Sequence, residues 1–349
     1  MLHQYCPSEL ASEPLTASSK RKATYSASSP RAKRHCRSED SHTTPCHGEP
    51  ETLIEKLRRA QGKARLVRPI FWTENILQEF QVEFVRTKRP RTSGSGLYDA
   101  EESGQARAHA TPWDDDDNIR WIKTLGQAGS NIQACLVKEI LKRRGMPWIT
   151  VRNDHAQLRT LRHRSATLGS DELAFLLGNK VATIVVTEGI FGTESSSQAC
   201  LAYIHFESIA LMRKREAWAV MGKRNSDNVE ELAKQCRDRE RWIRPRQECE
   251  DPYIIGILIA LAQEQRAKGD IEGQKGWKVH LIGLPETYAS EMYFYTATIP
   301  RSFLDRIDNP LERGECPGFK VSYELINLTK PRKAARLLYE VLRENALCK

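Results

Sequence analysis

The chain has 349 residues, with 54 Lys+Arg against 45 Asp+Glu, and its formal net charge at pH 7 is +9. Hydrophobic residues make up 40% of it, which is enough for a folded core and excludes a wholly disordered or fibrous chain. The longest apolar run, Tyr253–Ala262, is about half as long as a membrane-spanning helix, so we expect no membrane partner. The first residues, Met1–Pro14, lack the apolar segment of a secretory signal.

Residues 1–50 are rich in Ser, Thr, Pro and charge and have almost no aliphatic periodicity, which predicts a disordered basic tail. Two basic clusters about eleven residues apart are typical of a bipartite nuclear import signal, which adds an import carrier as a partner. We therefore expect a nuclear protein, the alternative being a cytoplasmic one with a generic solvated tail. The predicted import residues are Lys20, Arg21, Lys22, Lys33, Arg34 and Arg37.

The nine cysteines are scattered, odd in number and without a C-x-x-C pair, which indicates reduced thiols of the cytosol or nucleus. Histidines and cysteines gather only between His35 and His47. Their spacing there does not match a zinc finger, and they lie in the predicted tail. We therefore expect neither a metal nor another cofactor.

Hydrophobic residues at helical spacing in the segment 51–86 predict two amphipathic helices, one over Glu51–Arg59 and a second over Thr73–Val85. Residues 87–112 are polar and broken by Lys88–Gly96, which predicts a linker. The globular body is then expected over 113–349, beginning with acidic residues at the N-terminus of a helix.

Within the body, a helix predicted from Ser130 to Arg144 is followed by a short strand. Polar caps and glycine stops predict two more short helices, and β-branched runs predict two neighbouring strands before a pair of long helices. These elements are Pro147–Val151 (strand), His155–Arg164 and Asp171–Leu177 (helices), Val181–Thr187 and Ala199–Phe206 (strands), and Glu207–Met221 and Asp227–Ile243 (helices).

The most hydrophobic element begins at Asp251-Pro252, an N-cap followed by proline in the first helical position. Its apolar run predicts a helix that is buried on most faces. The remaining predicted elements are the strands Trp277–Leu284, Met292–Pro300 and Phe319–Leu328 and the helices Ser302–Ile307 and Pro331–Asn345. The irregular order predicts an α+β fold, with a mixed or antiparallel sheet of about five strands on that buried helix.

Positive charge gathers in two stretches. Lys142–Arg164 holds seven Lys/Arg and one acid, and Arg213–Arg246 holds eleven against six acids, with Trp218 and Trp242 between them. Arginine beside aromatic residues suits phosphate contacts and base stacking, although basic residues on the solvated face of a helix are an ordinary alternative. The candidate phosphate contacts are Arg143, Arg144, Arg159, Arg162 and Arg164.

Motifs that carry catalysis are missing from the sequence. It contains no G-x-x-x-x-G-K-[ST], no H-E-x-x-H, no G-x-S-x-G and no lysine two positions after a carboxylate, so the catalytic residues are unknown. We therefore expect a non-enzymatic nuclear or nucleocytoplasmic protein that binds unidentified protein partners or contacts nucleic acid through Arg-rich helices. The alternative is an enzyme whose site assembles in space, with a degenerate nuclease-like fold or an accessory role in a biosynthetic gene cluster.

Residues 251–349 carry a resemblance. The segments are Asp251-Pro252-Tyr253, Leu258–Gln263, Tyr295-Thr296-Ala297, Phe303-Leu304-Asp305 and Asn309-Pro310. Together they resemble a family of uncharacterised proteins from filamentous fungi. Most of these residues occupy cap, core and strand positions, so the resemblance implies a shared fold and a fungal source without implying an activity.

Overall fold

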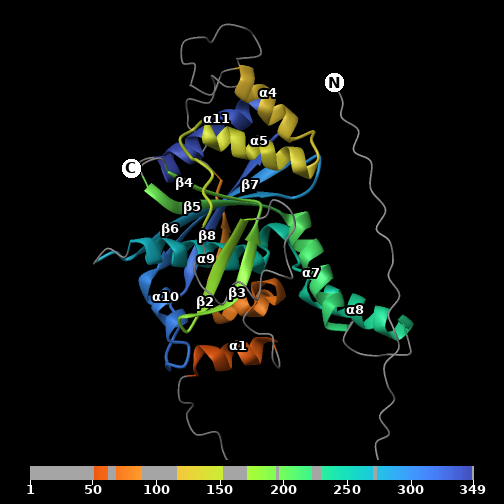
Figure 1. Ribbon diagram of the computed structural model, residues 1–349, viewed down its shortest axis with the longest axis vertical. Coiled ribbons are helices and arrows are strands. Elements are labelled where there is room, and N and C mark those ends of the chain that lie inside the picture. The colour runs from red at the N-terminus through yellow and green to blue at the C-terminus, as the bar shows by residue number, and fades with distance from the viewer. Residues whose placement is uncertain are drawn as a thin grey trace, which may run out of the picture. The chain divides into compact units, whose positions relative to one another are not determined.

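The computed structural model describes residues 51–61, 68–88, 116–151, 171–193, 196–221, 229–269 and 273–347 (Figure 1). The predicted tail with its six import-signal residues, nearly all of the 87–112 linker and the predicted helix His155–Arg164 lie outside these ranges. None of the described helices is long and apolar enough to cross a membrane.

A six-stranded mixed sheet organises the described chain, in the strand order β1-β8-β7-β6-β5-β4. The β1/β8 and β5/β6 pairs are parallel and the other pairs are antiparallel. The α+β prediction with a mixed sheet is confirmed, with one strand more than expected. The strands are β1 (Val82–Arg86), β4 (Gly189–Thr193), β5 (Ser196–His205), β6 (Gly276–Leu284), β7 (Glu291–Pro300) and β8 (Phe319–Asn327).

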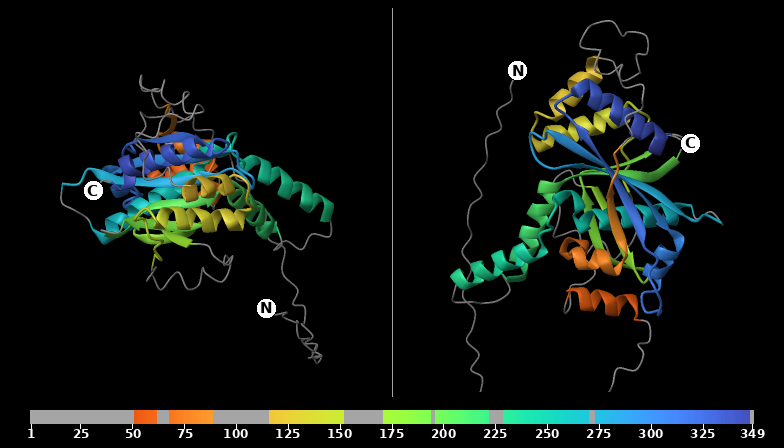
Figure 2. Two further views of the ribbon diagram at one scale, coloured as in Figure 1. Left: turned by 90° about the horizontal axis from the view of Figure 1, so that it is seen from above. Right: turned by 180° about the vertical axis from the view of Figure 1, so that it is seen from behind.

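Helices cover both faces of the sheet, and each face has its own apolar core (Figures 1 and 2). The helices of one face are α4 (Asp116–Leu125), α5 (Ser130–Lys142) and α11 (Pro331–Leu342), which runs into a π-helical turn at Arg343–Leu347. The other face carries α1 (Leu53–Gln61), a 3₁₀ turn η1 (Pro69–Phe71), α2 (Glu74–Glu79), α9 (Pro252–Lys268) and α10 (Arg301–Asp308). A second 3₁₀ turn, Glu248–Glu250, leads into α9.

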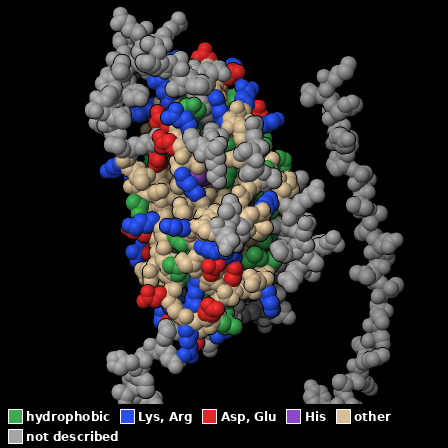
Figure 3. All heavy atoms as spheres, turned by 90° about the vertical axis from the view of Figure 1, so that its left-hand side faces the viewer, with side chains coloured by type: hydrophobic (Ala, Val, Ile, Leu, Met, Phe, Trp, Pro, Cys, Tyr) green, Lys and Arg blue, Asp and Glu red, His purple; other side chains and the backbone are tan. Residues whose placement is uncertain are grey.

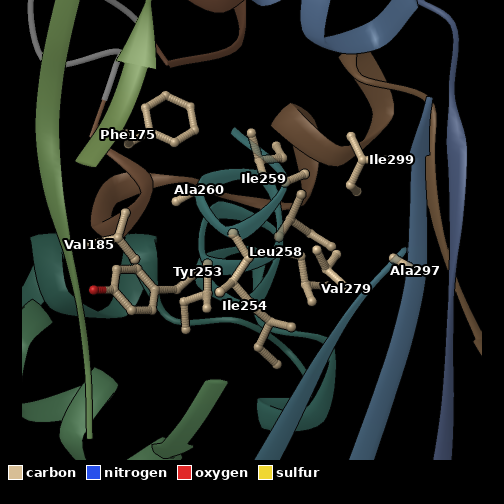
Figure 4. Close-up of a cluster of buried hydrophobic side chains, with 14 of the residues drawn as sticks. Phe175, Val185, Tyr253, Ile254, Leu258, Ile259, Ala260, Val279, Ala297 and Ile299 are labelled. Atoms are coloured by element: carbon tan, nitrogen blue, oxygen red, sulfur yellow. The ribbon is translucent and has the colours of Figure 1, made fainter. Parts of the chain in front are cut away.

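Helix α9 is the buried helix that the sequence predicts. The Asp251 side chain caps it by accepting a hydrogen bond from the backbone N–H of Tyr253, and Pro252 occupies the first turn. Its apolar residues fill the space between the sheet and an outer β-hairpin, and Figure 4 shows Leu258 facing Val279 of β6. A Cβ on Gly256 would lie 2.4 Å from the Cβ of Pro69, so glycine is what allows η1 to approach the helix.

The outer hairpin consists of β2 (Asp171–Leu177) and β3 (Lys180–Thr187). The sequence-based prediction of a helix over Asp171–Leu177 is therefore wrong. The turn is the signal that was missed, because Gly178 and Asn179 both have positive φ, as a two-residue hairpin turn requires. Pairing with β3 and packing on α9 override the helical propensity of the Glu, Leu and Ala residues.

Two side chains of α9 bind the backbone of this hairpin. The Gln263 amide both accepts from the N–H of Leu176 and donates to its carbonyl oxygen, where the register of β2 shifts. The Tyr253 hydroxyl makes the same two kinds of bond to Val186 of β3. The hairpin is thus held on α9 by hydrogen bonds as well as by apolar packing.

Two further predictions fail because strand pairing is not local. Ala199–Phe206 was expected beside Val181–Thr187, but β5 pairs with β4 and β6, and β3 pairs only with β2. The predicted short strand Pro147–Val151 is reduced to an isolated bridge between Trp148 and Phe191.

The segment 51–86 packs into the body. Leu53, Trp72, Ile76 and Phe80 are all buried in the core that surrounds α9. The predicted helix over Thr73–Val85 is wrong in its second half, because α2 ends at Glu79 and β1 follows. Gln81 reverses the chain with a φ of 52° before β1 joins the edge of the sheet, parallel to β8.

Candidate functional site

Helices α7 (Phe206–Met221) and α8 (Val229–Ile243) form a helical hairpin, which we call the arm. The arm projects from the side of the sheet (Figures 1 and 2). Helix α8 packs on α7, where the Cys236 thiol lies 4.0 Å from the carbonyl oxygen of Ala217. Because only one side of each helix is used in this contact, the opposite sides face solvent.

Large apolar side chains lie on the solvent-facing side of the arm. Trp218 is 43% exposed, Trp242 is 56% exposed, and Leu211 is similarly open to solvent. Large apolar groups that remain exposed together mark interaction surfaces more often than scattered ones do. Five exposed cationic side chains of the arm make no ion pair within the described part of the chain: Lys214, Arg215, Lys234, Arg237 and Arg241.

Acidic residues reduce the net positive charge of this surface, since Glu207, Glu230 and Asp238 are also exposed on the arm. On the side of the molecule that Figure 3 shows, Lys and Arg are likewise interspersed with Asp and Glu. The aromatic residues therefore distinguish the arm more than its net charge does.

Some arginines of the second basic stretch have structural roles. Arg213 is buried at the base of the arm, where its guanidinium pairs with both carboxylate oxygens of Asp251 and donates to the carbonyl oxygen of Ile70. Arg68 similarly makes two hydrogen bonds to Glu216. These contacts attach α7 to α9 and η1.

The candidate phosphate contacts do not gather into one described surface. Arg143 is exposed just after α5, but it stacks on the Trp121 ring at 3.9 Å and lies 3.3 Å from the carboxylate of Glu139. Arg144 is half-buried. Arg159, Arg162 and Arg164 lie outside the described residues. The assignment of these five arginines to phosphate contacts stays a prediction, and the arm is the better-described candidate.

A cluster of polar side chains lies at the base of the arm, where β5 ends and α7 begins. Glu188 connects β3 to β4, and its carboxylate accepts a hydrogen bond from the Ser208 hydroxyl. The nearby backbone N–H of His205 favours the ionised form of this carboxylate. The Tyr203 and His205 side chains are fully buried, with their rings in edge-to-face contact at 5.6 Å. We call Glu188, Tyr203 and His205 the buried polar cluster.

Burial governs the protonation of the cluster. It raises the pKa of Glu188 and the pKa of Tyr203, and it lowers the pKa of His205 to about 4, so His205 is uncharged at neutral pH. Lys138 of α5 is close enough to favour the ionised form of Glu188. Sequence reasoning missed this site, because its residues come from separate elements and form no motif.

Beside the cluster, Trp148 donates from its indole nitrogen to the Asp171 carboxylate at 2.6 Å, and Lys138 lies 4.3 Å from the Trp148 ring centre. The described residues contain no group of three or more His, Cys, Asp or Glu side chains that could hold a metal ion. Glu188, Tyr203 and His205 are side chains that can form hydrogen bonds and exchange protons.

Comparisons with protein-family models, curated proteins and solved structures find no match to the chain. The resemblance of residues 251–349 to fungal proteins stays a prediction, and the case for a function depends on the geometry of the arm and the cluster.

The two buried histidines predict a pH-dependent stability. Burial lowers the pKa of His205 to about 4 and that of His280 to about 3, against 6.5 for an exposed histidine. Below pH 6.5 the unfolded chain therefore binds protons that the folded chain does not. As the pH is lowered from about 6.5 to 4, we expect the free energy of unfolding to decrease by about 1.4 kcal/mol per pH unit for each histidine.

Urea unfolding of the wild type and of His280→Gln between pH 7 and 4.5 measures this effect. Raised carboxylate pKa values, such as that of Glu188, make the folded chain bind more protons above about pH 4.5 and so act in the opposite direction within the same range. The difference between the two proteins therefore isolates the histidine. We expect the shallower pH dependence in His280→Gln. Equal slopes would show that His280 is not a buried neutral group.

Proposed function

We propose that the protein binds nucleic acid through the arm and does so in the nucleus. The observation that carries the proposal is the exposure of Trp218 and Trp242 among cationic side chains that have no described ion-pair partner. An indole face stacks on a nucleic-acid base, and Lys or Arg beside it neutralises phosphates. Stacking needs an unpaired base, so the expected ligand is a single strand.

The arrangement along the arm supports two points of stacking. Because Cys236 packs against Ala217, Trp218 lies at the level of the middle of α8, whereas Trp242 lies near the last turn of α8 and the start of α7. Along α8, the level of Trp218 and the position of Trp242 are about seven residues apart, which corresponds to about 10 Å. Arg237 and Arg241 are exposed on α8 in this same region.

Nuclear delivery is the second part of the proposal. It is supported by the basic residues Lys20 to Lys22 and Lys33 to Arg37, whose spacing suits an import carrier. A protein partner on the same arm is the competing function, since exposed tryptophan is also common at protein interfaces.

The test is a salt titration of the full chain against a fluorescein-labelled single-stranded oligonucleotide of about twenty residues, followed by anisotropy. We expect affinity to fall steeply with salt. In Arg237→Gln/Arg241→Gln, the slope of log K against log salt should decrease in magnitude by about 1.4. Trp218→Ala should weaken binding about tenfold, the effect of losing one stacked base.

The matched control is Arg332→Gln/Lys333→Gln, which removes two exposed positive charges from α11 on the other face of the sheet. It should leave both the affinity and the salt slope nearly unchanged. If both double variants weaken binding equally, the charge acts non-specifically, and if the wild type does not bind at low salt, the proposal is wrong.

A further inference from the structure

The buried polar cluster contains four polar atoms for which the described residues provide no hydrogen-bond partner. These are Oε2 of Glu188, the hydroxyl oxygen of Tyr203 and both ring nitrogens of His205. Buried polar groups in folded proteins are nearly always hydrogen-bonded, because burial otherwise removes their bonds to water without replacement. Four such atoms at one place therefore indicate a ligand.

The other buried histidine and tyrosine side chains among the described residues have hydrogen-bond partners, whereas the buried indole nitrogen of Trp277 has none. His280 is as buried as His205, yet its two ring nitrogens lie 3.1 Å from the Thr296 hydroxyl and 3.1 Å from the carbonyl oxygen of Asn345. The buried hydroxyl of Tyr253 is likewise bonded to Val186. Burial of a histidine or tyrosine in this fold thus does not by itself leave polar atoms unpaired.

The spacing within the cluster fits one bridging atom. Nε2 of His205 lies 4.0 Å from Oε2 of Glu188, which is too far for a direct hydrogen bond. An oxygen placed about 2.8 Å from each atom would bond to both. The Tyr203 ring is in contact with His205, and its hydroxyl is close enough to Glu188 to be affected by the carboxylate charge.

The charges around the site disfavour an anionic ligand. Glu188 and the neighbouring Glu207 oppose an anion, while Lys138 balances one of the two carboxylates. An ionised carboxylate can only accept, whereas a neutral imidazole donates from one nitrogen and accepts at the other, and a phenol does both. A hydroxyl can donate to Glu188 and accept from His205 or Tyr203 through the same oxygen, so it fits a single bridging position.

We propose that Glu188, Tyr203 and His205 form a binding site for a hydroxyl group, belonging either to water or to an alcohol. Glu188 then accepts a hydrogen bond from the O–H group, which is the position of a general base relative to its substrate. The site is independent of nucleic-acid binding by the arm, although it lies where α7 begins.

Nuclear magnetic resonance of the full chain with labelled histidine tests the site, using water and methanol as probes. We expect nuclear Overhauser effects from the His205 ring protons to long-lived water, with none from the His280 ring. Added methanol should replace them by effects to its methyl protons if the site takes alcohols. Persistence of the water signals alone would assign the site to water, and absence of both signals at His205 would overturn the proposal.

Thermal unfolding gives a second measurement. Tyr203→Phe removes one hydroxyl, so we expect its Tm to fall by about 2 °C or more, because a hydrogen bond to the bound hydroxyl is lost. Tyr253→Phe, which loses the bonds to Val186, is the matched control and should fall in the same direction. An unchanged or higher Tm for Tyr203→Phe alone would show that its hydroxyl has no partner and would overturn the site.

Discussion

A fragment comprising residues 113–349 should fail to fold, although it contains every strand of the sheet except β1. It lacks the buried side chains of Leu53, Trp72, Ile76 and Phe80, which pack around α9. Each large buried apolar side chain contributes about 1.5–3 kcal/mol, and a whole domain is stable by only about 5–15 kcal/mol. Four such side chains contribute about 6–12 kcal/mol, which is comparable to the whole stability, and the edge of β8 is exposed as well.

The comparison fragment is 48–349, which retains α1, η1, α2 and β1. Far-ultraviolet circular dichroism and urea unfolding distinguish the two. We expect a cooperative transition for 48–349 and none for 113–349. A cooperative transition of similar midpoint in both fragments would show that the core folds without α1, η1, α2 and β1.

Arg213→Met should destabilise the protein by about 3–5 kcal/mol. Arg213 and Asp251 are 4% and 5% exposed, so removal of the guanidinium leaves a buried carboxylate without its countercharge. Asp251 also caps α9, and Arg213 donates to Ile70 of η1, so the variant disturbs the contact between the arm and the core helix. The free energy of unfolding from urea titration measures the loss.

Two further variants separate the buried pair from ordinary charge effects. Glu83→Gln breaks an ion pair with Lys320 in which both side chains are mostly exposed, and it should cost less than about 1 kcal/mol. Arg213→Met/Asp251→Asn removes both buried charges and should recover part of the loss. A cost below about 1 kcal/mol for Arg213→Met would show that solvent reaches Asp251 after the substitution.

The sequence alone predicts the helices and strands whose ends are marked by nearby residues. The Asp251-Pro252 cap and the apolar run after it predict α9, and segments rich in β-branched and aromatic residues predict β6, β7 and β8. The α+β class follows from the order of these elements. Each signal depends on residues within a few positions of one another, so the sequence alone is sufficient.

Contacts between distant segments decided the rest. Val82 pairs with Phe319 across more than two hundred residues, and that pairing makes a strand of a segment whose periodicity is helical. Asp171–Leu177 likewise becomes a strand because β3 and the Gln263 side chain bind its backbone. Helix and strand propensities each span only about 1 kcal/mol per residue, so tertiary hydrogen bonds and burial override them.

The candidate sites divide in the same way. The sequence shows Trp218 and Trp242 among basic residues, but only the packing of the arm decides that both indoles are exposed. Contacts of α7 with α9 and η1 decide that Arg213 is buried. Glu188 and His205 are brought together by the pairing of β4 with β5 and by the start of α7. A buried polar site assembled from separate elements has no local periodicity, and the tertiary structure alone determines it.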